Sequence, residues 1–132
     1  MPLKDLSTVV VPVRDQDAAL AFYTTVLGLE KISDFTYETG ERWLEVAPPG
    51  QIISLCLVAS GSAGVETGIA VCSDDVPGDL ERFRAAGARV DDALLTPGEV
   101  VGWAGAPLAG RPPQFRVWDP DGNSLLIVAQ VP

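Results

Sequence analysis

Histidine is absent from the 132-residue sequence, and this absence restricts the chemistry of the protein more than any other feature of its composition. Histidine is the most frequent general base in enzymes and the most frequent side-chain ligand of zinc and iron. Without it, no Ser-His or Cys-His catalytic arrangement can form. A metal centre held by imidazole groups is excluded for the same reason.

Basic residues are scarce as well, with 9 Lys and Arg against 18 Asp and Glu, which gives a net charge of −9. Proteins that bind the nucleic acid backbone need a basic surface that displaces counterions. We therefore expect no nucleic acid partner. The negative field favours a cationic ligand, although acidic residues also serve solubility alone, and both interpretations stay open.

Long apolar runs are missing, since no stretch approaches the roughly 20 residues of a membrane-spanning helix. The first residues lack the long apolar core and the cleavage site of a signal peptide. The two cysteines, Cys56 and Cys72, lie in apolar runs without a CxxC motif, which is typical of buried thiols in a reducing compartment. These observations predict a cytoplasmic protein with no membrane association.

A β-hairpin signal dominates the end of the chain, where two apolar runs in residues 115–130 flank the turn formers of residues 119–123. Residues 43–58 have the same pattern at an offset of 72, so that Gly50 corresponds to Gly122. The sequence therefore predicts a tandem repeat.

Each repeat is predicted to have the order β-α-β-β-β. In the first repeat, Asp15 or Asp17 caps the helix, and in the second repeat Asp74 or Asp75 does so. The predicted strands are residues 7–13, 29–38, 42–47, 52–58, 68–72 and 89–95 and the two strands of the closing hairpin. The second repeat is longer by about 12 residues, the difference between the offsets of 72 and 60, and we expect them to form an irregular segment around Trp103.

This pattern predicts an α+β fold in which two tandem βαβββ modules form a curved eight-stranded mixed sheet around a concave groove, with the helices outside. We expect one domain, residues 1–132, with module 1 at about 5–59, a linker at about 60–65 and module 2 at about 66–131. The linker is suggested by the small and polar residues of the segment ASGSAG.

Strand alternation predicts which side chains face the groove. Leu44 and Val46 should meet a helix, so Trp43 and Glu45 should face the groove. Arg116, which alternates with apolar neighbours, should point away from it. The predicted ligand-binding residues are Thr8, Phe35, Tyr37, Trp43, Ser54, Trp103, Phe115 and Leu126. Core packing is the alternative role of each aromatic residue among them, and Glu45 is the candidate catalytic residue, with pairing to a nearby arginine as its alternative.

Three segments together resemble the vicinal oxygen chelate superfamily, which includes glyoxalase I, extradiol dioxygenases and the fosfomycin- and bleomycin-resistance proteins. These segments are VVVPVRD, ALAFYTTVLGLE and DPDGNSLLIV. The resemblance covers nearly the whole chain and implies the fold described above. It does not identify one reaction, because this fold serves many chemistries.

The resemblance also implies four metal-ligand positions, two on the first strands and two on the last strands of the modules. They fall on Thr8, Gly68, Ser54 and Leu126, which cannot supply the imidazole or carboxylate ligands that a divalent metal requires. We therefore expect no metal and no cofactor.

Three functions remain open from the sequence. The first is sequestration of a small, possibly cationic aromatic molecule, as in the bleomycin-resistance proteins that the chain resembles. The second is a glyoxalase-like lyase or isomerase that uses Glu45 or an atypical metal site. The third is a vestigial domain whose groove is filled by its own side chains. The resemblance further implies a homodimer.

Overall fold

The computed structural model describes residues 2–130, which divide into two compact units, Met1–Ala63 and Gly64–Pro132. Each unit is described by itself. The elements of the first are β1 (Thr8–Val13), α1 (Gln16–Ala21), the π-helical turn η1 (Phe22–Val26), β2 (Glu30–Thr36), β3 (Arg42–Ala47) and β4 (Ser54–Ala59). Those of the second are β5 (Glu66–Ser73), α2 (Val76–Ala85), β6 (Arg89–Val90), β7 (Val101–Trp103), β8 (Ala106–Leu108), β9 (Gln114–Trp118) and β10 (Ser124–Ala129).

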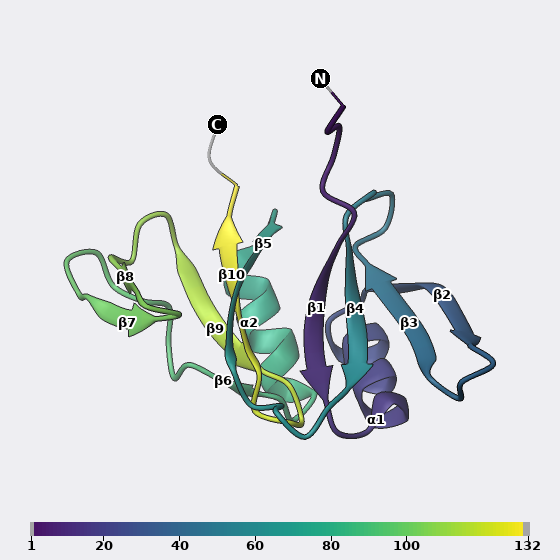
Figure 1. The fold of residues 1–132 in the computed structure, drawn as a ribbon. Coiled ribbons are helices and arrows are strands. Elements are labelled where there is room, and N and C mark those ends of the chain that lie inside the picture. Colours follow the sequence, from purple (N-terminus) through teal and green to yellow (C-terminus); the bar gives the residue numbers. More distant parts are fainter. Residues whose placement is uncertain (1, 131–132) are drawn as a thin grey trace. The chain divides into compact units, whose positions relative to one another are not determined.

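The two units repeat one topology (Figure 1). The first contains a sheet in the order β1-β4-β3-β2, and the second contains the equivalent sheet in the order β5-β10-β9-β6. In each sheet the first and last strands of the unit are parallel neighbours, and the remaining pairs are antiparallel. The predicted α+β class and the βαβββ repeat are confirmed. The union of the two sheets into one eight-stranded sheet around a groove stays a prediction.

The first helix begins where the sequence predicts. The carboxylate of Asp15 accepts a hydrogen bond from the Ala18 amide at 3.1 Å, so Asp15 is the N-cap. The helix widens into a π-helical turn, where the Leu27 amide donates to the Phe22 carbonyl at 3.2 Å. Tyr23, which belongs to this turn, is completely buried and forms the centre of the core of this unit.

The second helix is capped by Asp75, which accepts a hydrogen bond from the Gly78 amide at 3.0 Å. Leu80 and Phe83 of α2 are buried. The Phe83 ring packs edge-on against Phe115 of β9 at a centroid distance of 6.0 Å. This contact identifies the face of the sheet in unit 2 that the helix covers.

The predicted irregular segment around Trp103 is wrong in one respect, because residues 101–108 form a regular hairpin. Trp103 pairs with Ala106, so Ala104 and Gly105 make a two-residue turn, and both have positive φ, at 50° and 77°. This is the signature of a type I′ turn, which matches the twist of the paired strands. Alanine rarely adopts positive φ, so the Ala-Gly dipeptide gave no sequence signal for this turn.

The closing hairpin is fixed by side chains of its own turn. Asp119 accepts hydrogen bonds from the amides of Asp121 and Asn123, both at 2.9 Å. The side chain of Asn123, which is fully buried, accepts from the amides of Gly64 and Val65 at 2.8 and 2.9 Å. Asn123 therefore connects this turn to the segment that leads into β5.

The predicted module boundaries remain predictions. Residues 60–65 lie between β4 and β5, as a linker would, and the predicted end of module 2 at residue 131 lies outside the described residues. Within residues 2–130, no helix is long and apolar enough to cross a membrane.

Candidate functional site

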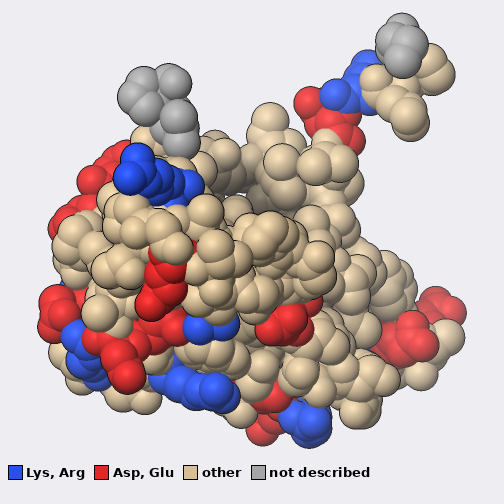
Figure 2. Space-filling model, turned by 90° about the vertical axis from the view of Figure 1, so that its left-hand side faces the viewer, with Lys and Arg blue, Asp and Glu red and all other residues tan. Residues whose placement is uncertain are grey.

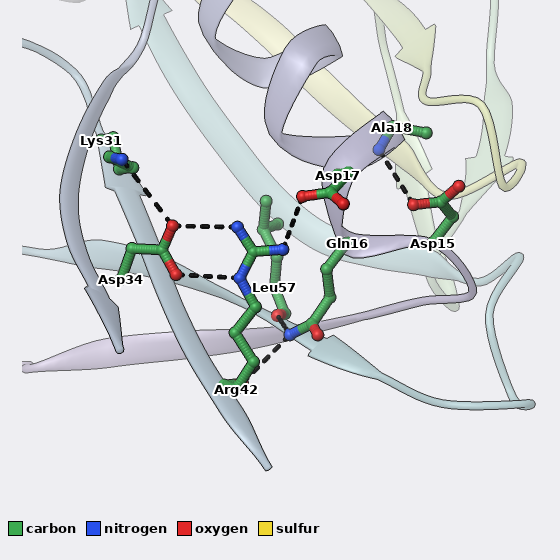
Figure 3. Close-up of polar contacts among 8 residues, drawn as sticks. All are labelled: Asp15, Gln16, Asp17, Ala18, Lys31, Asp34, Arg42 and Leu57. Carbon is green, nitrogen blue, oxygen red and sulfur yellow. Dashed lines mark hydrogen bonds and ion pairs between the residues drawn. The ribbon is translucent and has the colours of Figure 1, made fainter. Parts of the chain in front are cut away.

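The helix-covered face of the sheet in unit 1 is identified by an ion-pair cluster (Figure 3). Arg42 of β3 donates to both carboxylate oxygens of Asp34 at 2.8 and 2.9 Å, and to Asp17 of α1 at 2.7 Å. These hydrogen bonds hold the pKa of Asp34 below its usual value. Leu44 and Val46 share the alternation of Arg42 and are completely buried. The cluster attaches α1 to the sheet and is a structural feature.

Trp43 and Glu45 therefore lie on the opposite face, which we call the open face of unit 1. The strand register brings further residues to it, because Glu45 pairs with Cys56, Phe35 pairs with Trp43, and Ser54 pairs with Thr8. The alternation argument thus placed Trp43 and Glu45 on the correct side of their strand.

Four of the predicted site residues are joined by hydrogen bonds on this open face. The Trp43 indole N–H donates to Oε1 of Glu45 at 2.5 Å. The Ser54 hydroxyl lies 3.2 Å from Oε2 of Glu45 and 2.9 Å from the hydroxyl of Thr8. Thr8 in turn donates to the Ser54 carbonyl at 3.0 Å. We call Thr8, Trp43, Glu45 and Ser54 the polar tetrad.

The tetrad fixes the position of the Glu45 carboxylate. Both of its oxygens face donors of the protein, and the sheet holds the donors at fixed register. The predicted alternative, pairing of Glu45 with an arginine, is not what the structure shows, since no ion pair within residues 2–130 includes Glu45. Ser54 carries a single hydroxyl proton, so it donates to Glu45 or to Thr8 but not to both at once.

Cys56 also lies on this face, and sequence reasoning did not include it among the site residues. Its thiol is completely buried, and burial raises its pKa, with the nearby Glu45 carboxylate acting in the same direction. The thiol therefore stays protonated at neutral pH. Alternation along its strand already places Cys56 on the same face as Ser54, although it was not selected as a site residue.

The residues at the implied metal-ligand positions do not fit a divalent metal. Thr8 and Ser54 hydrogen bond to one another, Leu126 offers a hydrocarbon side chain, and Gly68 has no side chain. No group of three or more His, Cys, Asp or Glu residues within the described chain is placed to hold a metal ion.

The open face of unit 2, opposite α2, differs from the prediction. Phe115 is completely buried and contacts Phe83 of the helix, so it faces the core and not the predicted ligand surface. Arg116 pairs with Leu126 across the β9–β10 ladder, so these two side chains share the open face. The alternation of β9 was therefore assigned in the wrong phase. Applying the rule used for β3, that the apolar residues meet the helix, gives the observed orientation.

Arg116 is held on this face by neighbours of unit 2. It forms a two-point contact with Asp91 at 2.7 and 3.1 Å, and its guanidinium carbon lies 5.2 Å from the ring centre of Trp118. Arg89 lies on the same ring at 4.2 Å. The hydrogen bonds that Arg116 donates to Asp91 raise the pKa of Arg116, which is cationic at every physiological pH.

Trp103 is placed on the open face of unit 2 by the inserted hairpin. It is only 5% exposed, and its indole N–H donates to the Ser124 hydroxyl at 2.9 Å. Ser124 stands two residues before Leu126 and therefore on the same face of β10. Alternation in the sequence already places Ser124 on the same face as Leu126, but only Trp103 and Leu126 were selected as ligand-binding residues.

Phe35 and Tyr37 lie at the tip of the β2–β3 hairpin, away from the tetrad's hydrogen bonds. Their rings meet edge-on at 4.9 Å, and each residue is 46% exposed. They line a shallow surface pocket of ≈ 660 Å³ together with Glu38 and Glu41. The ligand-binding role of both residues remains a prediction.

Acidic and basic side chains are mixed on one side of the surface. On the face drawn in Figure 2, Lys and Arg side chains lie among Asp and Glu side chains and form no continuous basic surface.

Comparison with known proteins identifies the family of this chain. The model of the Glyoxalase/Bleomycin resistance protein/Dioxygenase superfamily matches residues 5–127. The uncharacterized protein YetH of Bacillus subtilis is 30% identical over 129 residues, which cover 95% of this chain and 98% of YetH.

Solved structures with a similar fold lead to the same family. The antibiotic binding protein TnmS3 from Streptomyces sp. CB03234 is 30% identical and covers 99% of both chains with a TM-score of 0.77. A superfamily member from Sphaerobacter thermophilus has the same fold, with a TM-score of 0.81 at 23% identity over 98% of this chain and 100% of its own. The chain therefore belongs to the Glyoxalase/Bleomycin resistance protein/Dioxygenase superfamily.

Proposed function

We propose that the protein binds a small cationic aromatic molecule without transforming it, and that the polar tetrad forms part of its binding site. One observation carries this proposal. The tetrad presents the Glu45 carboxylate and an indole ring beside the hydroxyl groups of Thr8 and Ser54, which occupy two of the positions where the resemblance implies metal ligands.

The similarity to TnmS3 supports a binding role, because that protein is described as antibiotic binding and is 30% identical to this chain. The net charge of −9 supports a cationic ligand, since the field of the protein attracts positive charge. Both arguments favour a molecule that combines a planar ring with an amine or a related cation.

The tetrad provides two kinds of attraction for such a molecule. The Glu45 carboxylate accepts hydrogen bonds from a cationic group, and a charged hydrogen bond contributes about 1.5–3 kcal/mol. The Trp43 ring offers a flat face, and a cation or ring on it contributes about 0.5–2 kcal/mol. Because the Trp43 N–H holds Glu45 in place, the carboxylate needs little reordering when the ligand arrives.

Calorimetric titration with metal-free bleomycin tests this proposal, because its planar bithiazole tail carries a cation. We expect saturable binding by the wild type and a loss of about 10–100-fold in affinity for Glu45→Gln, the factor that corresponds to one charged hydrogen bond. Glu30→Gln is the matched control, since Glu30 is an exposed carboxylate of the same unit and its loss changes the net charge equally.

Equal effects of Glu45→Gln and Glu30→Gln would show that only the general field matters and that the tetrad is not the site. Metal analysis of the purified protein provides a second test. Stoichiometric zinc, nickel, manganese or iron would contradict a metal-free binding site.

A lyase or isomerase reaction with Glu45 as general base is the second candidate, because Ser54 and Thr8 link the carboxylate to a chain of hydroxyl groups. Binding is favoured, because both carboxylate oxygens are already engaged by donors of the protein. Mass spectrometry of the ligand after prolonged incubation separates the two, since a binding protein returns it unchanged.

We also propose that the protein is a cytoplasmic homodimer. Leu6, Val10 and Ile52 of unit 1 are 70%, 56% and 79% exposed, and such apolar residues favour a contact with another chain. Light scattering coupled to gel filtration should give twice the monomer mass of 13.9 kDa. A single species of monomer mass would contradict the dimer.

A further inference from the structure

The inserted hairpin of unit 2 covers part of the open face that carries Leu126, one of the positions at which the resemblance implies a metal ligand. Trp103 lies on the open face of the sheet with 5% of its surface exposed, beside the strand that carries Leu126. The sheet therefore has an indole ring where a ligand would contact Ser124 and Leu126. This ring comes from an insertion and not from the repeated βαβββ framework.

The hairpin is connected to the rest of unit 2 by a narrow base. Gly110 lies so close to Thr96 that a Cβ atom at Gly110 would come within 2.3 Å of the Thr96 carbonyl oxygen, so the two stems meet there. Beyond the base, β7 and β8 form a two-stranded sheet of their own and do not join the four-stranded sheet of unit 2. An isolated two-stranded hairpin is marginally stable in water, so its position depends on its contacts with the sheet.

Two contacts hold the tip of this hairpin. The Trp103 N–H donates to Ser124 at 2.9 Å, and the Ala104 amide donates to the Glu66 carboxylate at 2.8 Å. The second contact is exposed to solvent, where it contributes little. The burial of Trp103 and its hydrogen bond therefore provide most of the attachment.

We propose that Trp103 is a displaceable plug, and that the group that replaces it is a planar aromatic ring with an N–H donor for the Ser124 hydroxyl. This inference rests on the proposed function and names the chemistry of the ligand group that the open face of unit 2 accepts. The indole of Trp103 shows which chemistry fits this surface, because it combines a flat apolar ring with one N–H group.

Ser124 is suited to this exchange. Its backbone amide donates to the Val65 carbonyl at 3.0 Å, and its carbonyl accepts from the Thr67 hydroxyl at 2.8 Å. The strand thus stays fixed when Trp103 leaves, and the hydroxyl oxygen becomes available to another donor. Leu126, two residues on, supplies the apolar floor for a ring.

Binding of 9-aminoacridine, a planar cation with N–H donors, tests the plug directly. Its affinity should rise about tenfold in Trp103→Ala, because the fraction of protein with an open surface increases. Val100→Ala is the control, since Val100 is 65% exposed and its replacement leaves the buried Trp103 ring in place. Circular dichroism confirms that both variants are folded.

Unchanged or weaker binding by a folded Trp103→Ala variant would overturn the inference, as would a failure of 9-aminoacridine to bind either protein. The proposed function is judged separately by bleomycin and Glu45→Gln. If Glu45→Gln weakens bleomycin binding while Trp103→Ala changes nothing, the plug alone is wrong.

Hydrogen exchange provides a test that needs neither ligand nor variant. We expect the Trp103 indole N–H to exchange through local opening, at least about 100-fold faster than the Leu125 amide, which lies in β10 and opens with the core. Fluorine NMR of 5-fluorotryptophan-labelled protein should then show the Trp103 resonance moving to the position of a solvent-exposed tryptophan when 9-aminoacridine is added. Exchange of both protons at the rate of global unfolding would show that Trp103 is an ordinary core residue and would overturn the proposal.

Discussion

Replacing Asn123 by alanine should destabilise the protein more than any other single change in its turns. The Asn123 side chain is fully buried and accepts hydrogen bonds from the amides of Gly64 and Val65, at 2.8 and 2.9 Å. It also donates to the Asp119 carboxylate at 2.8 Å. The alanine variant leaves two backbone donors and one carboxylate oxygen without this partner.

The magnitude follows from these three contacts. A buried polar group that loses its partner costs about 1–3 kcal/mol, and the two amides are only partly buried, so the lower end applies to each. We therefore expect the free energy of unfolding to fall by about 3 kcal/mol. With a urea m-value of about 1–3 kcal/mol/M, the midpoint should move down by about 1–3 M.

Urea unfolding followed by circular dichroism measures this loss, with Gln51→Ala as the matched control. Gln51 is the counterpart of Asn123 in the first repeat, but its side chain is exposed, so its loss should cost less than about 0.5 kcal/mol. A loss below about 1 kcal/mol for Asn123→Ala would refute the reasoning, because water would then satisfy the amides equally well.

Three further predictions follow from individual contacts. Hydrogen bonds from Arg42 lower the pKa of Asp34, so the stability that Asp34 contributes is present above its ordinary pKa of 3.8 and is lost as the pH falls through the lower pKa of the folded state. Urea unfolding should therefore show a larger stability difference between wild type and Asp34→Asn at pH 7 than at pH 2. An equal difference at both pH values would contradict this origin. Cys72 is exposed and should react with Ellman's reagent at neutral pH. Cys56 should react only after unfolding, because it is buried and burial raises the pKa of its thiol. Rapid reaction of both thiols in the native protein would show that Cys56 is accessible. Gly110→Ala should lower the thermal midpoint by several degrees, because Gly110 has a φ of 73° and a Cβ atom has no room beside the Thr96 carbonyl. Gly98 also has positive φ but has free space around it, so Gly98→Ala should lower the midpoint less. Equal losses for the two variants would show that backbone strain alone matters.

Most of the fold could be predicted from local patterns. Asp15 and Asp75 open the helices, and the turn formers around Gly122 and Gly50 mark the hairpins, because capping and positive φ depend on neighbouring residues alone. The inserted hairpin was missed because its strands are only three residues long, Val101–Trp103 and Ala106–Leu108, too short to show alternation.

The candidate site was predicted in part. Trp43 and Glu45 were placed on the correct face because their neighbours in β3 are apolar and must meet the helix. The same rule was not applied to β9, so Phe115 was assigned to the ligand surface although it packs on Phe83. In β9 both faces are largely buried, and burial alone then leaves the phase of the strand open.

The sequence by itself determined the repeat, the helix caps and the hairpin turns, because each depends on residue type and short spacing. Only the tertiary structure decided how these residues combine. Strand register joined Thr8 to Ser54 across 46 positions, and the insertion brought Trp103 to Ser124. Such contacts are set by pairing and packing between distant segments, and no local pattern specifies them. The closing hairpin carries both kinds of information, since its turn is fixed by Asp119 locally and by Gly64 through the fold.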